Sequence, residues 1–175
     1  MGVSCNLYLR DDVRIDDVST VMGILAGLPV EEVELRGASG GSYASVFCAR
    51  PKPSNSPEMV IIELEGNLID GQAGHFCFFH YEHEKQARYR LLSMASTPFW
   101  CAIAKELVEF FGGYVDYKDT DNVKVDFKAA GKFKKNNPVE DAEWQAFQNA
   151  ILKIKPLTKK DLNEAKKYSY WEAWE

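Results

Sequence analysis

The segment 75–84, HFCFFHYEHE, holds the residues of this sequence that are best suited to chemistry. In a regular strand His75 and Cys77 share one face, because side chains alternate between the two faces of a sheet. An imidazole nitrogen and a thiolate are both zinc ligands, so the pair is a candidate for part of a metal site. A closed site needs further ligands from elsewhere. We therefore favour the alternative, in which Cys77 belongs to the core and the histidines are solvated or hydrogen-bonded.

The cysteines are four and widely spaced, with no C-x-x-C pair. They are Cys5, Cys48, Cys77 and Cys101. Each lies in an apolar or strand-like context, so we predict buried free thiols of low reactivity. The sequence also lacks a nucleophile elbow, a Walker A loop and a strand-linked G-x-G-x-x-G. We expect no cofactor, and the missing reaction signatures favour a non-enzymatic protein.

Charge is distributed unevenly along the 175 residues, whose formal net charge is −5. Residues 1–70 carry 5 basic and 11 acidic side chains, whereas residues 131–175 carry 9 and 7. An acidic N-terminal part disfavours nucleic acid as a partner, because phosphate binding depends on lysine and arginine. It suits a basic protein partner better. We define the acidic front as Asp11, Asp12, Asp16, Asp17, Glu31, Glu32 and Glu34.

Two classes of function follow from these patterns. The first is a non-enzymatic protein that binds a macromolecule through the acidic front, as an inhibitor or immunity-type protein acting on a basic protein. The alternative is a small-molecule or metal-binding protein, or an enzyme, with a pocket between sheet and helices that uses His75, Cys77 or His80. The sequence does not define the oligomeric state.

The elements that must position these residues are clearest around the segment 98–111. Ser96 or Thr97 can cap a helix, Pro98 suits its first position, and Gly112-Gly113 can end it. Apolar residues recur at helical spacing from Trp100 onward, which predicts an amphipathic helix packed on a sheet. A second amphipathic helix is predicted after a cap at Asp16 or Asp17. A third is expected after Thr158, with Asp161 three residues on.

Strands are predicted from alternating patterns over residues 5–10, 33–36, 43–50, 59–65, 75–83 and 90–95, and around a turn at residues 119–122. The fold class is therefore α+β: a largely antiparallel sheet with two packed amphipathic helices and a C-terminal helical appendage. The same order of elements recurs in the two halves, so tandem β-α-β-β units are an open alternative to one continuous sheet.

We expect residues 1–132 to form the α+β core domain and residues 133–175 a helical segment docked on it, within one folding unit. The sequence has no apolar run of 18 residues and no basic, apolar leader. We therefore expect a cytoplasmic protein that does not associate with membranes.

Overall fold

A five-stranded antiparallel sheet organises the computed structural model, which describes residues 3–10, 13, 15–28, 59–80, 89–118, 146 and 149–170. The strands are β1 (Ser4–Arg10), β2 (Met59–Glu65), β3 (Gly74–His80), β4 (Tyr89–Ala95) and β5 (Tyr114–Asp116), in the order β2-β3-β4-β1-β5. Every pairing is antiparallel. The predicted α+β class with a largely antiparallel sheet is confirmed.

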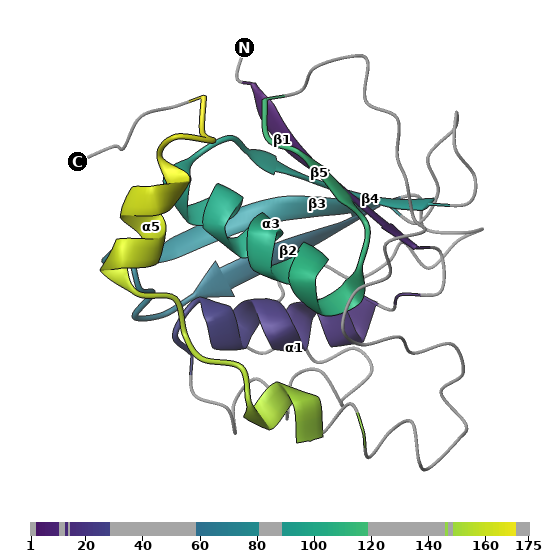
Figure 1. The fold of residues 1–175 in the computed structure, drawn as a ribbon, viewed down its shortest axis with the longest axis horizontal. Coiled ribbons are helices and arrows are strands. Elements are labelled where there is room, and N and C mark those ends of the chain that lie inside the picture. The colour runs from purple at the N-terminus through teal and green to yellow at the C-terminus, as the bar shows by residue number, and fades with distance from the viewer. Residues whose placement is uncertain are drawn as a thin grey trace.

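Alternation within the strands sets which side chains enter the core. Leu7 pairs with Leu92, and Leu92 pairs with Phe79, so a row of three fully buried side chains crosses the sheet. Helices α1 (Ile15–Leu25) and α3 (Pro98–Phe111) cover this face (Figure 1). The core therefore lies between the sheet and these two helices.

Helix α3 begins and ends as its sequence predicts. Thr97 Oγ1 accepts a hydrogen bond from the backbone N–H of Trp100 at 3.3 Å, and Pro98 occupies the first turn. At the other end Gly112 has a φ of 81° and donates its N–H to Val108 O at 2.8 Å. The next residue leaves no room for a side chain, because a Cβ on Gly113 would lie 2.2 Å from Tyr8 O.

Helix α1 starts earlier than predicted. The helix already includes Ile15, so neither Asp16 nor Asp17 is its cap, and that prediction is wrong. Both residues lie in its first turn, where an acidic side chain opposes the partial positive charge of the helix end. The side chains of Val18, Val21 and Met22 on this helix are buried.

Helix α5 (Lys159–Ala165) packs against α3 (Figure 1). It has the predicted capping box, in which Asp161 N–H donates to Thr158 Oγ1 at 3.3 Å and Thr158 N–H donates to Asp161 Oδ2 at 2.8 Å. The strands predicted at 33–36 and 43–50 and the turn at 119–122 lie outside the described residues. The tandem-unit alternative and the domain boundary at 132 thus stay predictions.

No helix in the described part of the chain has the length and hydrophobicity needed to cross a membrane.

Candidate functional site

His75 lies at the start of β3 and is bound to the loop that precedes it. Its Nε2 donates to Asp70 Oδ2 at 2.5 Å, while Asp70 Oδ1 accepts from the backbone N–H of Gln72 at 3.0 Å. Because an ionised carboxylate only accepts, Nε2 carries the proton. The two side chains are 20% and 16% exposed. The carboxylate therefore fixes the orientation of an imidazole that is still accessible to solvent.

The loop 66–73 holds Asp70 in place through its own contacts. Ile69 donates its N–H to Ala26 O, just beyond α1, at 3.0 Å. Leu68 is buried, and its carbonyl accepts from Gly71 N–H at 2.9 Å to close a turn. Gly71 has a φ of 82°, a conformation that glycine adopts at little cost. Asp70 thus sits on a loop fixed by backbone hydrogen bonds.

Two aromatic residues of α3 support the imidazole from the core side. The His75 ring stacks on Phe99, with centroids 4.1 Å apart and an interplanar angle of 14°. Trp100 meets the His75 ring edge-on at 6.0 Å. Both aromatics are almost fully buried at the start of α3. His75 therefore contacts a dry aromatic surface on one side and the loop carboxylate on another.

One face of α5 and its C-cap completes the site. Lys159, Leu162, Asn163 and Lys166 all line the same cleft, and their spacing of i, i+3, i+4 and i+7 is that of one helical face. The helix is held at both ends. Before it, Leu157 donates its N–H to Leu25 O at 2.9 Å; after it, Tyr170 donates its N–H to Ser96 Oγ at 2.8 Å.

These elements enclose what we call the His75 cleft, a cavity of about 520 Å³. Its other lining residues are Ile69, Asp70, Gln72, Thr97, Pro98 and Phe99. Ligand sites typically combine an apolar lining with a few convergent polar groups and occupy roughly 300–1,000 Å³. The His75 cleft meets that description, and it lies between the loop 66–73 with the start of β3, the start of α3, and α5.

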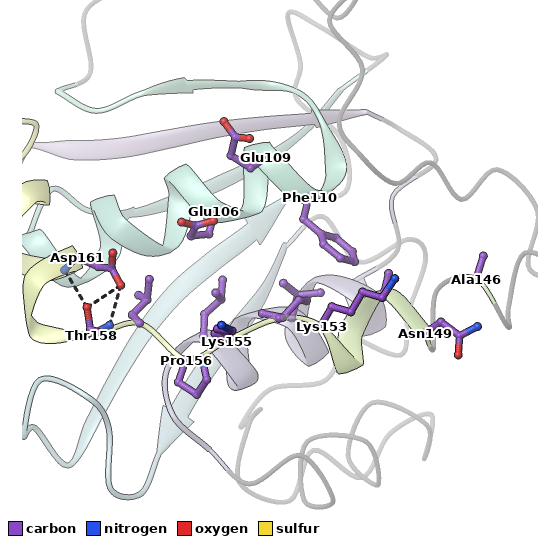
Figure 2. Close-up of a pocket in the computed structure, with 15 residues that line it drawn as sticks. Glu106, Glu109, Phe110, Ala146, Asn149, Lys153, Lys155, Pro156, Thr158 and Asp161 are labelled. Carbon is purple, nitrogen blue, oxygen red and sulfur yellow. Dashed lines mark hydrogen bonds between the residues drawn. The ribbon is translucent and has the colours of Figure 1, made fainter.

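A second cleft, of about 640 Å³, lies on the other side of the C-terminal segment. We call it the Glu106 cleft. Figure 2 shows Glu106 and Glu109 along α3, with Lys153 and Lys155 on the segment below it. Asp161 also lines this cleft, but its carboxylate is engaged in the capping box (Figure 2). The Glu106 cleft therefore carries charges of both signs around an aliphatic floor.

The three cysteines in the described residues are buried free thiols, as predicted. Burial raises the pKa of Cys77 well above its ordinary value. A hydrogen bond to Cys101, together with burial, raises the pKa of Cys5, and the same bond lowers the pKa of Cys101. All three thiols are buried, whichever way their pKa is shifted. Cys48 lies outside the described residues.

Ser96 connects these thiols to the C-terminal segment. Its Oγ donates to Tyr117 O at 2.5 Å, accepts the Tyr170 N–H, and lies 3.9 Å from Cys101 Sγ. The rings of Tyr117 and Tyr168 stack with centroids 4.6 Å apart. This cluster fixes the chain beyond α5 to the end of β5.

The two alternative metal ligands have different surroundings. His75 lines the cleft, whereas Cys77 is fully buried in the core. Within the described ranges, no group of three or more His, Cys, Asp or Glu side chains could hold a metal ion. His80 lies on the opposite face of β3 from His75, because the two positions are five apart and side chains alternate along a strand.

Most of the acidic front lies outside what the structure describes. That is the case for Asp11, Asp12, Glu31, Glu32 and Glu34, and for the side chain of Asp16. Asp17 is described and only 5% exposed, so its carboxylate is not part of an open surface. The acidic front stays a prediction from the sequence.

Several residues of the His75 cleft were not singled out by the sequence. Asp70 and Phe99 meet His75 only through the fold. The i, i+3, i+4, i+7 spacing of the α5 residues is visible in the sequence. That spacing does not show which residues lie across the cleft from α5. No known protein family matches this sequence, and no curated protein or solved structure is similar to it.

Proposed function

We propose that this chain is a binding protein for a small molecule, with the His75 cleft as the ligand site. The observation that supports this proposal is the convergence of His75, Thr97, Asn163 and two lysines on one cavity of about 520 Å³. The imidazole is oriented by Asp70 and Phe99 before any ligand arrives. Preorganised polar groups reduce the entropy lost on binding.

The experiment is a fragment screen read by NMR at the imidazole of His75. The chain has 3 histidines, so their ring signals can be assigned one by one by substitution. We expect fragments that shift the His75 ring signals and leave those of His80 and His83 unchanged. A screen in which no fragment shifts the His75 signals would argue against the proposal.

A variant that fills the His75 cleft tests whether the ligand binds there. Asn163 is exposed and lines the cleft, so Asn163→Trp should fill the cavity without disturbing the core. Leu152→Trp is the matched control, because Leu152 is 70% exposed and lines neither cleft. Binding should be lost in the first variant and kept in the second. Equal binding in both would place the ligand elsewhere.

The predicted protein partner is a separate proposal that rests on the charge of residues 1–70. Charge reversal at Asp16, Glu31 and Glu32 should slow association with a basic partner and reduce its salt dependence. Capture from the native host followed by this comparison is the test. Unchanged capture and salt dependence would refute the acidic front as the binding surface.

A further inference from the structure

We infer that the ligand of the His75 cleft is a small anion, such as a carboxylate or phosphate, that carries a compact apolar group. This inference rests on the proposed function and adds the chemical class of the ligand. It depends on the charges of the cleft, on how the acidic group among its described lining residues is used, and on the apolar residues beside them.

The charged side chains of the lining are mainly basic. Lys159 and Lys166 project from one face of α5 and its C-cap, and Asp70 is the one carboxylate among the lining residues that the structure describes. The whole chain has a net charge of −5, whereas basic side chains outnumber acidic ones in the described lining of this cleft. No carboxylate of the described residues forms an ion pair with Lys159.

The Asp70 carboxylate is already used within the protein. One oxygen accepts from His75 and the other accepts from Gln72. A ligand cation would have to compete with both hydrogen bonds, whereas a ligand anion would meet the ammonium group of Lys159 directly. The charge of Asp70 therefore acts on His75 and does not make the cleft a cation site.

The apolar part of the lining lies next to these charges. Ile69 and Leu162 are partly exposed, and with Pro98 they border the cavity beside the buried ring of Phe99. A purely ionic ligand would leave this surface wet, whereas an apolar group would bury it. The cavity has room for a ring of six atoms next to the anionic group.

Three probes that share one ring and differ in charge test the inference: benzoate, benzamide and benzylamine. Affinity is measured by titration of the His75 ring signals. Benzoate should bind about fivefold more tightly than benzamide, since it meets the exposed ammonium group of Lys159. Benzylamine should bind more weakly than benzamide. Raising the salt concentration should weaken the binding of benzoate and leave the binding of benzamide unchanged.

Substitutions assign the effect to the lysines of the cleft. Lys159→Gln and Lys166→Gln should each weaken the binding of benzoate about twofold to fivefold, which is the range of an exposed ion pair. Neither variant should alter the binding of benzamide. Lys160→Gln is the matched control, because Lys160 is exposed on the same helix and lines neither cleft. Circular dichroism confirms that the variants are folded.

The outcomes separate this inference from the proposed function. If benzamide binds in the cleft as well as benzoate does, or if Lys160→Gln weakens benzoate as much as Lys159→Gln, the anion inference is wrong and the small-molecule site stands. If none of the three probes shifts the His75 signals, the anion inference fails, and it falls together with the proposed function when the wider fragment screen is also negative.

Discussion

The His75 cleft and the Glu106 cleft share the C-terminal segment as a wall but differ in what stands opposite it. Opposite α5, the His75 cleft has an oriented imidazole on an aromatic floor. Opposite the segment 153–158, the Glu106 cleft has carboxylates on the outer surface of α3 and the aliphatic side chains of α1 (Figure 2). The Glu106 cleft is thus the larger of the two but has no oriented imidazole among its lining residues. Volume alone does not identify the functional site.

The comparison also separates the parts of the chain that hold each cleft. Both depend on α3 and on the anchoring of Leu157, whereas the fixed loop 66–73 serves the His75 cleft alone. Changes to the shared frame should therefore affect both clefts. Changes to α5, or to the residues opposite the C-terminal segment in one cleft, should affect mainly that cleft.

The largest effect is expected at Gly113, which positions the shared helix against β1. A Cβ there would lie 2.2 Å from Tyr8 O, and the φ of 126° is already strained for any other residue. Gly113→Ala should cost about 3 kcal/mol or more of unfolding free energy and remove both clefts. Chemical denaturation measures it. The control is Gly71→Ala, where φ is 82° and no heavy atom lies within 4 Å; equal losses in the two variants would contradict the steric explanation.

The next effect concerns Leu157, which fixes the segment between the clefts. It is 3% exposed, so Leu157→Ala should cost about 2–4 kcal/mol through lost burial and the cavity left behind. Leu152→Ala, at a residue 70% exposed, should change stability by less than about 0.5 kcal/mol. Thermal or urea unfolding compares the two. If both variants unfold alike, the segment is not anchored as described.

A smaller effect is expected at Thr158, where the capping box starts α5. Thr158→Ala should cost about 1 kcal/mol, and it should weaken ligand binding in the His75 cleft because two cleft lysines are carried by α5 and its C-cap. Thr158→Ser retains the hydroxyl and should behave like the original chain. A serine variant as destabilised as the alanine variant would show that the hydrogen bond is not responsible.

The smallest effect concerns Cys77, a fully buried thiol on β3 that lines neither cleft. Burial raises the pKa of Cys77, so the folded protein keeps this proton while the unfolded chain loses it above about pH 8.5. The stability that this thiol contributes is therefore present below that pH and falls as the pH rises, by up to about 0.8 kcal/mol at pH 9. Unfolding measured from pH 7.5 to 9.5 should show a shallower decline in Cys77→Ala. Identical declines would contradict the burial of the thiol.

The elements with local signals were predictable from the sequence. Thr97, Pro98 and Gly112 bound α3 through contacts within a few residues, and Thr158 with Asp161 starts α5 in the same way. The start of α1 was misplaced because an aspartate is favourable throughout the first turn and not only at the cap.

The candidate site was less predictable because it depends on contacts between distant residues. His75 was singled out by its type, but its partners come from a loop and from α3, and the other wall of its cleft comes from α5. The pairing with Asp70 requires the turn closed by Leu68 and Gly71, and the approach of Lys159 requires the anchor at Leu157. No local pattern encodes which of these segments meet.

The most direct test of the His75 cleft as an anion site is a crystal structure with 4-bromobenzoate, in which the bromine is located by its anomalous scattering. We predict a bromine peak in the His75 cleft, with the carboxylate directed toward Lys159 or Lys166. A peak in the Glu106 cleft instead, or no ordered bromine at a concentration that shifts the His75 signals, would contradict the account.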